Sequence, residues 1–262
     1  MYGWLNGKYG GYGWFGQHSS GDGVAARVFD YGYPAGAYVE SDVVCQFIFE
    51  ETTTGDDIVD TVSSITCPDV TSTVYPLYGQ VPADSAWDPV SPGIQCRPTA
   101  EFALTTATAS MSPGTGDFTV EWIMKWLATV TSLGYLFSLN NASTVRGLMV
   151  YYTGGTNTMN IYLNSETGSA INTAIVLTPD LKDGDVMKFR LTFDRSGNLE
   201  LEINGASQGT ASISALDGDT ISNHQTRING QYNGGSSVGY TTFYEWRLSH
   251  NITNDSLYPG AF

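Results

Sequence analysis

Alternating apolar and polar side chains mark the strands of this chain most clearly in its second half. Within residues 186–193 every second side chain is apolar, and Lys188 and Arg190 lie between them. A period of two is typical of a strand with one buried face and one face toward solvent. Residues 199–203 alternate in the same way, and the Asn-Gly dipeptide at 204–205 favours a tight type I′ turn. The sequence therefore predicts consecutive antiparallel strands here.

The same pattern recurs along the chain, between turns rich in Gly, Thr, Ser and Asn. In the strand predicted at 118–127, Glu121 and Lys125 are expected on the solvent side. We find no amphipathic helix in the sequence, which predicts an all-β fold: a two-sheet antiparallel jelly-roll sandwich. The expected core side chains of strand 118–127 are Phe118, Val120, Trp122, Met124 and Trp126. Further strands are predicted from residue 43 and at residues 101–107, 134–139, 147–152, 159–164, 174–177, 206–213, 226–231 and 240–249.

Four segments add information through their order along the chain. They are VVCQFIFEETTTGDDIVD from residue 43, DFTVEWIMKW from 117, GDVMKFRLTFDRSGNLELEINGASQG from 184 and GYTTFYEWRLSHNIT from 239. In this order they resemble the strands and turns of concanavalin A-like (laminin G-like) lectin and glucanase domains. One departure is Tyr244, which stands where the closing strand of such domains commonly has an aspartate. The resemblance covers residues 43–258 and implies a lectin-type sandwich.

Composition divides the chain into an arm and a sandwich. Residues 1–42 alternate Gly with aromatic side chains, a composition too flexible to form its own core. Residues 43–262 form the expected sandwich, with a Pro-rich loop insertion at residues 61–100. We expect the arm to bury its aromatic side chains in another subunit, as interface anchors do. Its candidate partner-binding residues are Tyr2, Trp4, Tyr9, Tyr12, Trp14 and Phe15.

The charge of the chain excludes some classes of partner. The formal net charge is −15 at pH 7, which argues against binding nucleic acid or anionic membranes, since both require clustered Lys and Arg. We see no secretory signal sequence and no membrane-spanning run. Cys45 is expected as a buried thiol in a strand, whereas Cys67 and Cys96 could form a disulfide in an oxidising medium.

Catalytic groups are sparse in the sequence. Glucanase relatives of this fold use carboxylates that line a cleft, but Glu200 and Glu202 flank a leucine on a strand that leads into a hairpin. The pattern favours solvated carboxylates on an outward face. The histidines, at positions 18, 224 and 250, have no recognisable triad partners and are expected at the surface. We therefore predict no catalytic residues.

Two kinds of ligand remain candidates. Calcium, which lectin-type sandwiches often hold, would use loop carboxylates, although turn-forming aspartates are the commoner interpretation. The metal candidates are Asp183, Asp185, Asp217 and Asp219. Glycan binding needs an aromatic platform beside amides and hydroxyls, although hairpin ends are rich in the same residues. The glycan candidates are Tyr152, Asn157, Tyr232 and Asn233.

The arm, the acidic sandwich and the missing signal sequence make the chain similar to lectin-like structural proteins of tailed-phage virions. That resemblance implies a non-enzymatic decoration or adhesion protein at the virion surface, made in the host cytoplasm. Its expected partners are other virion proteins, contacted through the arm, and cell-surface glycans; it would be a homo-oligomer or bound to a lattice. The alternative is a free carbohydrate-binding module or a glucanase-like glycoside hydrolase.

Overall fold

The fold is seen in a computed structural model, which describes part of the chain. The described residues are 43–48, 58–59, 66–67, 77–78, 94–96, 102–106, 111–126, 133–140, 146–181, 185–228 and 241–252. Within these ranges the chain forms β-strands, turns and the 3₁₀ helix η4 (Ser214–Leu216), and no α-helix. No helix in the described ranges is long and apolar enough to cross a bilayer.

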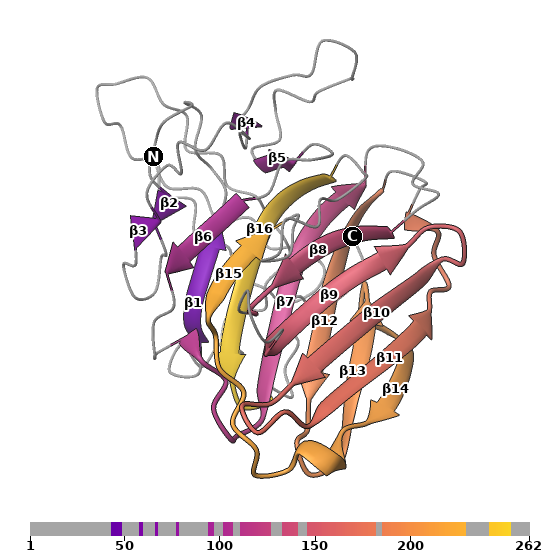
Figure 1. Ribbon diagram of the computed structural model, residues 1–262. Coiled ribbons are helices and arrows are strands. Elements are labelled where there is room, and N and C mark those ends of the chain that lie inside the picture. The colour runs from indigo at the N-terminus through magenta and orange to yellow at the C-terminus, as the bar shows by residue number, and fades with distance from the viewer. Residues whose placement is uncertain are drawn as a thin grey trace, which may run out of the picture.

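Two antiparallel sheets pack face to face, as the sequence predicted (Figure 1). β16 pairs with β7 on one side and with both β1 and β5 on the other. The first sheet runs in the order β14 (Ala206–Ser212), β13 (Asn198–Ile203), β12 (Val186–Phe193), β7 (Phe118–Trp126), β16 (Thr241–His250), β5 (Ile94–Cys96) and β4 (Leu77–Tyr78), with β1 (Val43–Ile48) beside β16. The second runs β11 (Ala170–Val176), β10 (Thr158–Asn164), β9 (Gly147–Thr153), β8 (Leu133–Ser138), β15 (Gln225–Ile228) and β6 (Phe102–Thr106). β2 (Ile58–Val59) and β3 (Thr66–Cys67) form a separate pair.

Aromatic side chains join the two sheets. Trp122 of β7 stacks on Phe189 of β12, with ring centroids 4.8 Å apart, and meets the edge of Phe137 from β8 at 4.9 Å. Trp126 meets Tyr152 of β9 in the same edge-on manner at 5.3 Å. Each such pair stabilises by about 0.5–1.5 kcal/mol beyond its buried area. The predicted core side chains of β7 are all buried, so this interpretation is confirmed.

Local turn chemistry follows the sequence closely, but the short strands β3, β4 and β5 lie within the predicted Pro-rich insertion and one further strand begins early. Asn204 and Gly205 have φ values of 52° and 77°, as a type I′ turn requires, which confirms the predicted hairpin between β13 and β14. Cys45 is fully buried in β1, as expected. β11, however, begins at Ala170, four residues before the predicted start, because small and polar side chains alternate too weakly there to mark a strand.

Candidate functional site

The outer face of the second sheet presents tyrosine and amide side chains. Tyr135, Tyr151, Asn160 and Tyr162 lie on β8, β9 and β10, and each is partly exposed. Tyr135 is opposite Tyr151, and Tyr151 is opposite Asn160. The Tyr135 and Tyr151 ring centroids lie 5.8 Å apart. Tyr162 follows two residues after Asn160 and so shares its face. We call these four residues the tyrosine-amide face.

Polar atoms on this face are only partly used within the protein. Asn160 donates from Nδ2 to Thr153 Oγ1 at 3.0 Å and to the Thr158 carbonyl oxygen at 3.3 Å. The Tyr162 hydroxyl accepts a hydrogen bond from Asn164 Nδ2 at 3.4 Å. Both bonds of Asn160 use its nitrogen, so its carbonyl oxygen can accept a bond from a ligand. Tyr162 can donate its hydroxyl proton in the same way.

The strands behind this face carry no charge. β8, β9, β10 and β11 contain no Asp, Glu, Lys or Arg, although the whole chain has a net charge of −15. At the edge strand β11 the outward positions include Asn172 and Ala174, both exposed, and Val176, which is 67% exposed. This surface is therefore polar and aromatic but uncharged.

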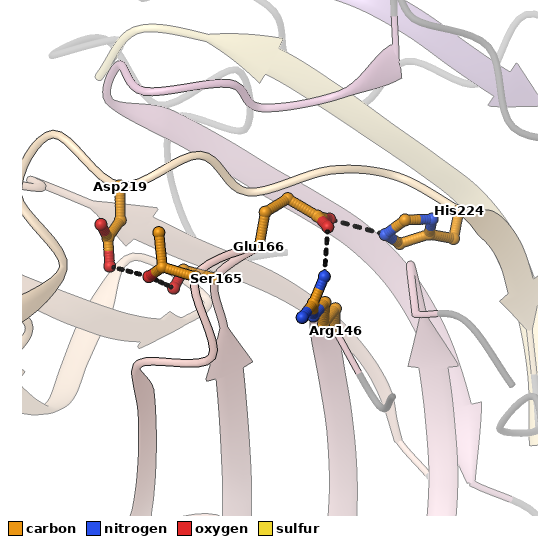
Figure 2. Close-up of polar contacts among 6 residues, drawn as sticks. Arg146, Ser165, Glu166, Asp219 and His224 are labelled. Atoms are coloured by element: carbon orange, nitrogen blue, oxygen red, sulfur yellow. Dashed lines mark hydrogen bonds and ion pairs between the residues drawn. The ribbon is translucent and has the colours of Figure 1, made fainter. Parts of the chain in front are cut away.

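Charged side chains gather at one end of the face, where β9 begins and β10 ends (Figure 2). Glu166, in the turn after β10, contacts an arginine and a histidine side chain. Its Oε2 lies 3.2 Å from Arg146 Nη1, and its Oε1 lies 2.7 Å from His224 Nε2. Arg146 precedes β9 and His224 precedes β15. We call these three residues the carboxylate bridge.

The pKa of Glu166 reflects these contacts. Partial burial alone would raise it, but hydrogen bonds from His224, Ser222 and Arg146 outweigh burial and leave the pKa below its ordinary value of 4.5. The carboxylate is thus ionised at neutral pH. Because Glu166 already contacts Arg146 and His224, the carboxylate bridge joins separate segments of the chain. These two side chains are therefore poor binding groups for an anionic ligand.

Gly147 allows these segments to approach one another. Its φ is +108°, and a Cβ there would overlap the Leu139 carbonyl oxygen and lie 3.0 Å from the Ser222 carbonyl oxygen. Backbone hydrogen bonds join Leu139 N to the Leu148 oxygen at 2.7 Å and His224 N to the Leu139 oxygen at 3.1 Å. Glycine is therefore required where the chain before β15 passes the start of β9.

A second polar group lies beside the carboxylate bridge. Asp219 Oδ2 accepts a hydrogen bond from Thr167 Oγ1 at 3.0 Å, and the Thr167 and Ser165 hydroxyl oxygens are 2.8 Å apart (Figure 2). Bonds from Thr167 and then Ser165 lower the pKa of Asp219 below its ordinary value of 3.8. The buried guanidinium of Arg195 donates to the backbone carbonyls of Asp219, at 2.7 Å, and Leu216. These contacts fix the loop after η4.

On the first sheet, the outer face carries a ladder of alternating charge. Arg247 of β16 is opposite Glu121 of β7, Glu121 is opposite Arg190 of β12, and Arg190 is opposite Glu202 of β13. Arg247 Nε lies 3.0 Å from Glu121 Oε2, and Arg190 Nη1 lies 3.2 Å from Glu202 Oε2. Opposite charges that face each other across strands stabilise by about 0.2–1 kcal/mol per pair. We call these four residues the charged ladder.

Burial of the ladder corrects two predictions. Glu121 and Lys188 were expected to face solvent, but they are 0% and 4% exposed. Alternation identifies the side of the sheet on which a residue lies, not whether that side is open to water. Burial lowers the pKa of Lys188, and the nearby Glu245 carboxylate opposes this effect. Lys125, at the end of β7, is partly exposed.

Two predicted glycan residues have an internal structural role. Tyr152 is fully buried against Trp126, and its hydroxyl donates to Asn157 Oδ1 at 2.8 Å. Asn157 Nδ2 donates in turn to the carbonyl oxygens of Leu177, at 2.9 Å, and Pro179, at 3.2 Å. The pair thus holds the β9–β10 turn against the chain after β11. The Tyr152 ring lies in the core rather than at the surface.

Several other predicted residues lie outside the part of the chain that the structure describes, and their roles stay predictions. In the arm these are Tyr2, Trp4, Tyr9, Tyr12, Trp14 and Phe15; elsewhere they are Tyr232 and Asn233 of the glycan set, and Asp183 of the metal set. The side chains of Cys67 and Cys96 also lie outside it.

The calcium candidates that are described do not converge. Asp185 and Asp217 are exposed, and Asp219 accepts hydrogen bonds from hydroxyl groups. Among the described side chains no three His, Cys, Asp or Glu residues gather as ligands of one ion. Calcium binding stays a prediction.

The carboxylates and histidines considered for catalysis lie apart. Glu202 is paired with Arg190, and Glu200 is partly exposed on the outward side of β13. His224 belongs to the carboxylate bridge, and His250 Nε2 lies 3.0 Å from the Ser112 carbonyl oxygen. Both histidines are partly exposed, and His18 lies outside the described residues.

Sequence reasoning missed the tyrosine-amide face and the carboxylate bridge. A signal for the face was present, because Tyr151 alternates with the apolar residues Val150 and Tyr152, and the three strands that carry the face lack charge. Nothing local marked the bridge, since Arg146, Glu166 and His224 are distant in sequence.

Comparison with solved structures shows a shared fold. No protein-family model matches the chain, and no curated protein sequence does. The binding domain of paraclostridial mosquitocidal protein 1 superposes with a TM-score of 0.60 at 14% identity, over 82% of this chain and 50% of that one. A botulinum neurotoxin serotype D ligand-binding domain in complex with N-acetylneuraminic acid gives 0.56 at 11% identity, over 81% and 48%. The serotype G binding domain gives 0.55 at 12% identity, over 80% and 48%.

This chain therefore spans about half the length of the structures it matches. All three are binding domains, and two of them belong to botulinum neurotoxins. At these identities the likeness shows a common sandwich fold. The concanavalin A-like assignment within that fold stays a prediction.

Proposed function

We propose that this chain is a non-catalytic glycan-binding protein. The observation that carries the proposal is the shared fold with toxin binding domains over about four-fifths of the chain, one of them holding a sugar acid. The tyrosine-amide face supports it, because aromatic rings beside amides and hydroxyls suit sugar rings. Fold alone does not dictate function, so the proposal needs a direct test.

The test pairs a binding assay with an activity assay on the full chain. Fluorescently labelled protein is applied to an array of neutral and acidic glycans, and the glycans that bind are incubated with it while reducing ends are measured. We expect binding without release of reducing sugars. Sugar release that disappears in Glu200→Gln or Glu202→Gln would instead establish a glucanase-like hydrolase. An array without specific signal would refute glycan binding.

We further propose that the protein is a virion component, attached through residues 1–42. Support comes from the sequence: a Gly-rich backbone with regularly placed aromatic side chains needs a partner to bury them. In this arrangement copies of the chain assemble on a lattice of other virion proteins and display the sandwich at the particle surface.

Alanine substitution of arm aromatics tests this attachment in the full chain. The variant replaces Trp4, Trp14 and Phe15 together, and its incorporation into particles is measured beside that of the wild type. We expect a folded, soluble protein that is absent from purified particles. Normal incorporation would refute the role of the arm.

A further inference from the structure

We propose that the tyrosine-amide face binds an uncharged oligosaccharide laid across β8, β9 and β10. The inference rests on the proposed glycan-binding function and deepens it, because it names the site and the class of glycan. Its basis is the placement of Tyr135, Tyr151, Tyr162 and Asn160 on one outer surface.

The register of β8, β9 and β10 places the three tyrosine rings side by side, so that successive sugars of one oligosaccharide could contact them. Tyr135 and Tyr151 are direct cross-strand neighbours. Tyr162 is a diagonal neighbour of Tyr151, and diagonal pairs lie about 7–8 Å apart, within reach of aromatic side chains. Each ring can pack against the C–H face of a pyranose, as aromatic rings pack against apolar surfaces generally. The three rings therefore form a platform across three strands.

Polar groups beside the rings match hydroxyls. The Asn160 carbonyl oxygen can accept a hydrogen bond, and the Tyr162 hydroxyl can donate one. Asn172 is directly opposite Tyr162 on β11 and is exposed. A site for a polar, uncharged ligand typically combines aromatic rings, which contact the ligand, with a few polar groups, which fix its orientation.

Charge selects the class of glycan. The four strands of this sheet region carry no cation to pair with a carboxylate or sulfate, and the whole chain repels anions with its net charge of −15. Arg146 and His224, at the end of the face, already contact Glu166. Arg227, on the neighbouring strand β15, is partly exposed and lies opposite Ser138 of β8, three residues from Tyr135. With no cation on β8, β9, β10 or β11 themselves, neutral hexose and N-acetylhexosamine chains fit this face better than sialylated or sulfated chains.

The experiment compares tyrosine variants of the full chain. The probes are immobilised neutral oligosaccharides (β-glucan, xylan, mannan and N-acetylglucosamine oligomers) beside sialylated and sulfated glycans, and affinity for the best neutral oligosaccharide is then measured by titration. Tyr151→Ala and Tyr162→Ala should each weaken binding at least about tenfold through the lost ring contact. Tyr151→Phe keeps the ring and should stay within about threefold of the wild type. Tyr244→Ala, on β16 of the first sheet, is the matched control and should bind normally.

The outcomes separate this inference from the function on which it rests. Glycan binding that persists in Tyr151→Ala and Tyr162→Ala, or that is confined to acidic glycans, overturns the inference and leaves glycan binding intact. If the variants instead change the oligomeric state in light scattering and no glycan affinity, the face is a protein interface and the inference is wrong. Absence of any glycan binding by the folded wild type overturns both.

Discussion

The outer faces of the two sheets differ in charge and in exposure to solvent. On the first sheet, Arg247 and Glu121 of the charged ladder are 1% and 0% exposed. On the second, the tyrosine-amide face has no charge, yet its tyrosines are partly exposed and Val176 is 67% exposed. The buried charges of the first sheet are thus paired, whereas strands β8, β9, β10 and β11 of the second sheet carry no charge.

This distribution indicates what each face does. Buried charges are tolerated only when a partner compensates for lost hydration, as the register of the ladder provides. An open protein surface normally mixes charges of both signs, which keeps it soluble. A partly open sheet face without charge gives up that benefit. Such a face is typical of a surface that binds a partner.

Breaking the buried end of the ladder should have the largest effect. Glu121→Gln removes the nearer of the two carboxylates beside the buried Arg247 guanidinium and leaves Glu245 Oε1 at 3.8 Å, which should cost up to about 3–5 kcal/mol. The matched variant at the open end is Glu202→Gln, whose pair with Arg190 is more exposed and should cost about 1 kcal/mol or less. Urea unfolding of both variants measures the difference.

A double variant sharpens the interpretation. Glu121→Leu with Arg247→Met replaces the pair by apolar side chains and should recover part of the lost stability, because neither member stays buried without the other. The buried Glu245 loses Arg247 but keeps the hydrogen bond from Gln46 and the nearby Lys188. Equal losses of unfolding free energy in Glu121→Gln and Glu202→Gln would show that burial does not set the strength of the two pairs.

The end of the second face depends on a glycine, and Gly147→Ala should have the next largest effect. Its positive φ and the overlap of a Cβ with the Leu139 carbonyl oxygen lead us to expect a loss of about 2 kcal/mol or more. Gly168→Ala is the matched control, since Gly168 has φ +93° but open space around its Cβ position. Thermal unfolding should show a clearly smaller loss for Gly168→Ala; equal losses would mean that backbone conformation alone matters.

Much of the fold could be predicted from the sequence because the relevant signals are local. Alternation marked β7 and β12, and the Asn-Gly dipeptide at 204–205 marked its hairpin. The burial of Glu121 could not be predicted in this way, because it depends on which parts of the chain cover that side of the sheet.

The candidate site was predicted less well, for two physical reasons. Tyr152 was chosen as an aromatic beside a polar turn, but neighbouring residues in a strand point to opposite faces, and the outward one is Tyr151. Arg146, Glu166 and His224 meet only after three separate segments have folded together, so no sequence spacing announces them.

Acid should weaken the carboxylate bridge. The expected loss of stability is smaller than for Glu121→Gln or Gly147→Ala. The pKa of Glu166 is lower in the folded state than its ordinary value of 4.5, so its stabilising contribution is present above that pH and is lost as the pH falls through the folded-state pKa. Glu166→Gln should lower stability at pH 7 by about 1 kcal/mol or less, since these groups are partly exposed. The gap between wild type and variant should shrink below pH 4.5.

Melting temperatures at pH 7 and pH 3 test this prediction. Glu200→Gln, a partly exposed carboxylate on β13, is the control and should change stability by less than about 0.5 kcal/mol at pH 7. A gap between wild type and Glu166→Gln that stays constant, or widens in acid, would contradict the assigned role of the bridge.

The smallest effect should come from adding a charge to the second face. Val176 lies on the edge strand β11 and is 67% exposed, so Val176→Lys should change the free energy of unfolding by less than about 0.5 kcal/mol. The same side chain at Ile123, which is 1% exposed in β7, would be expected to destabilise more, because it buries an additional cation between Lys188 and Glu245. If Val176→Lys proved costly, strand β11 would be covered in solution. The second sheet would then have no open outer face at Val176, and the contrast between the two outer faces would be wrong there.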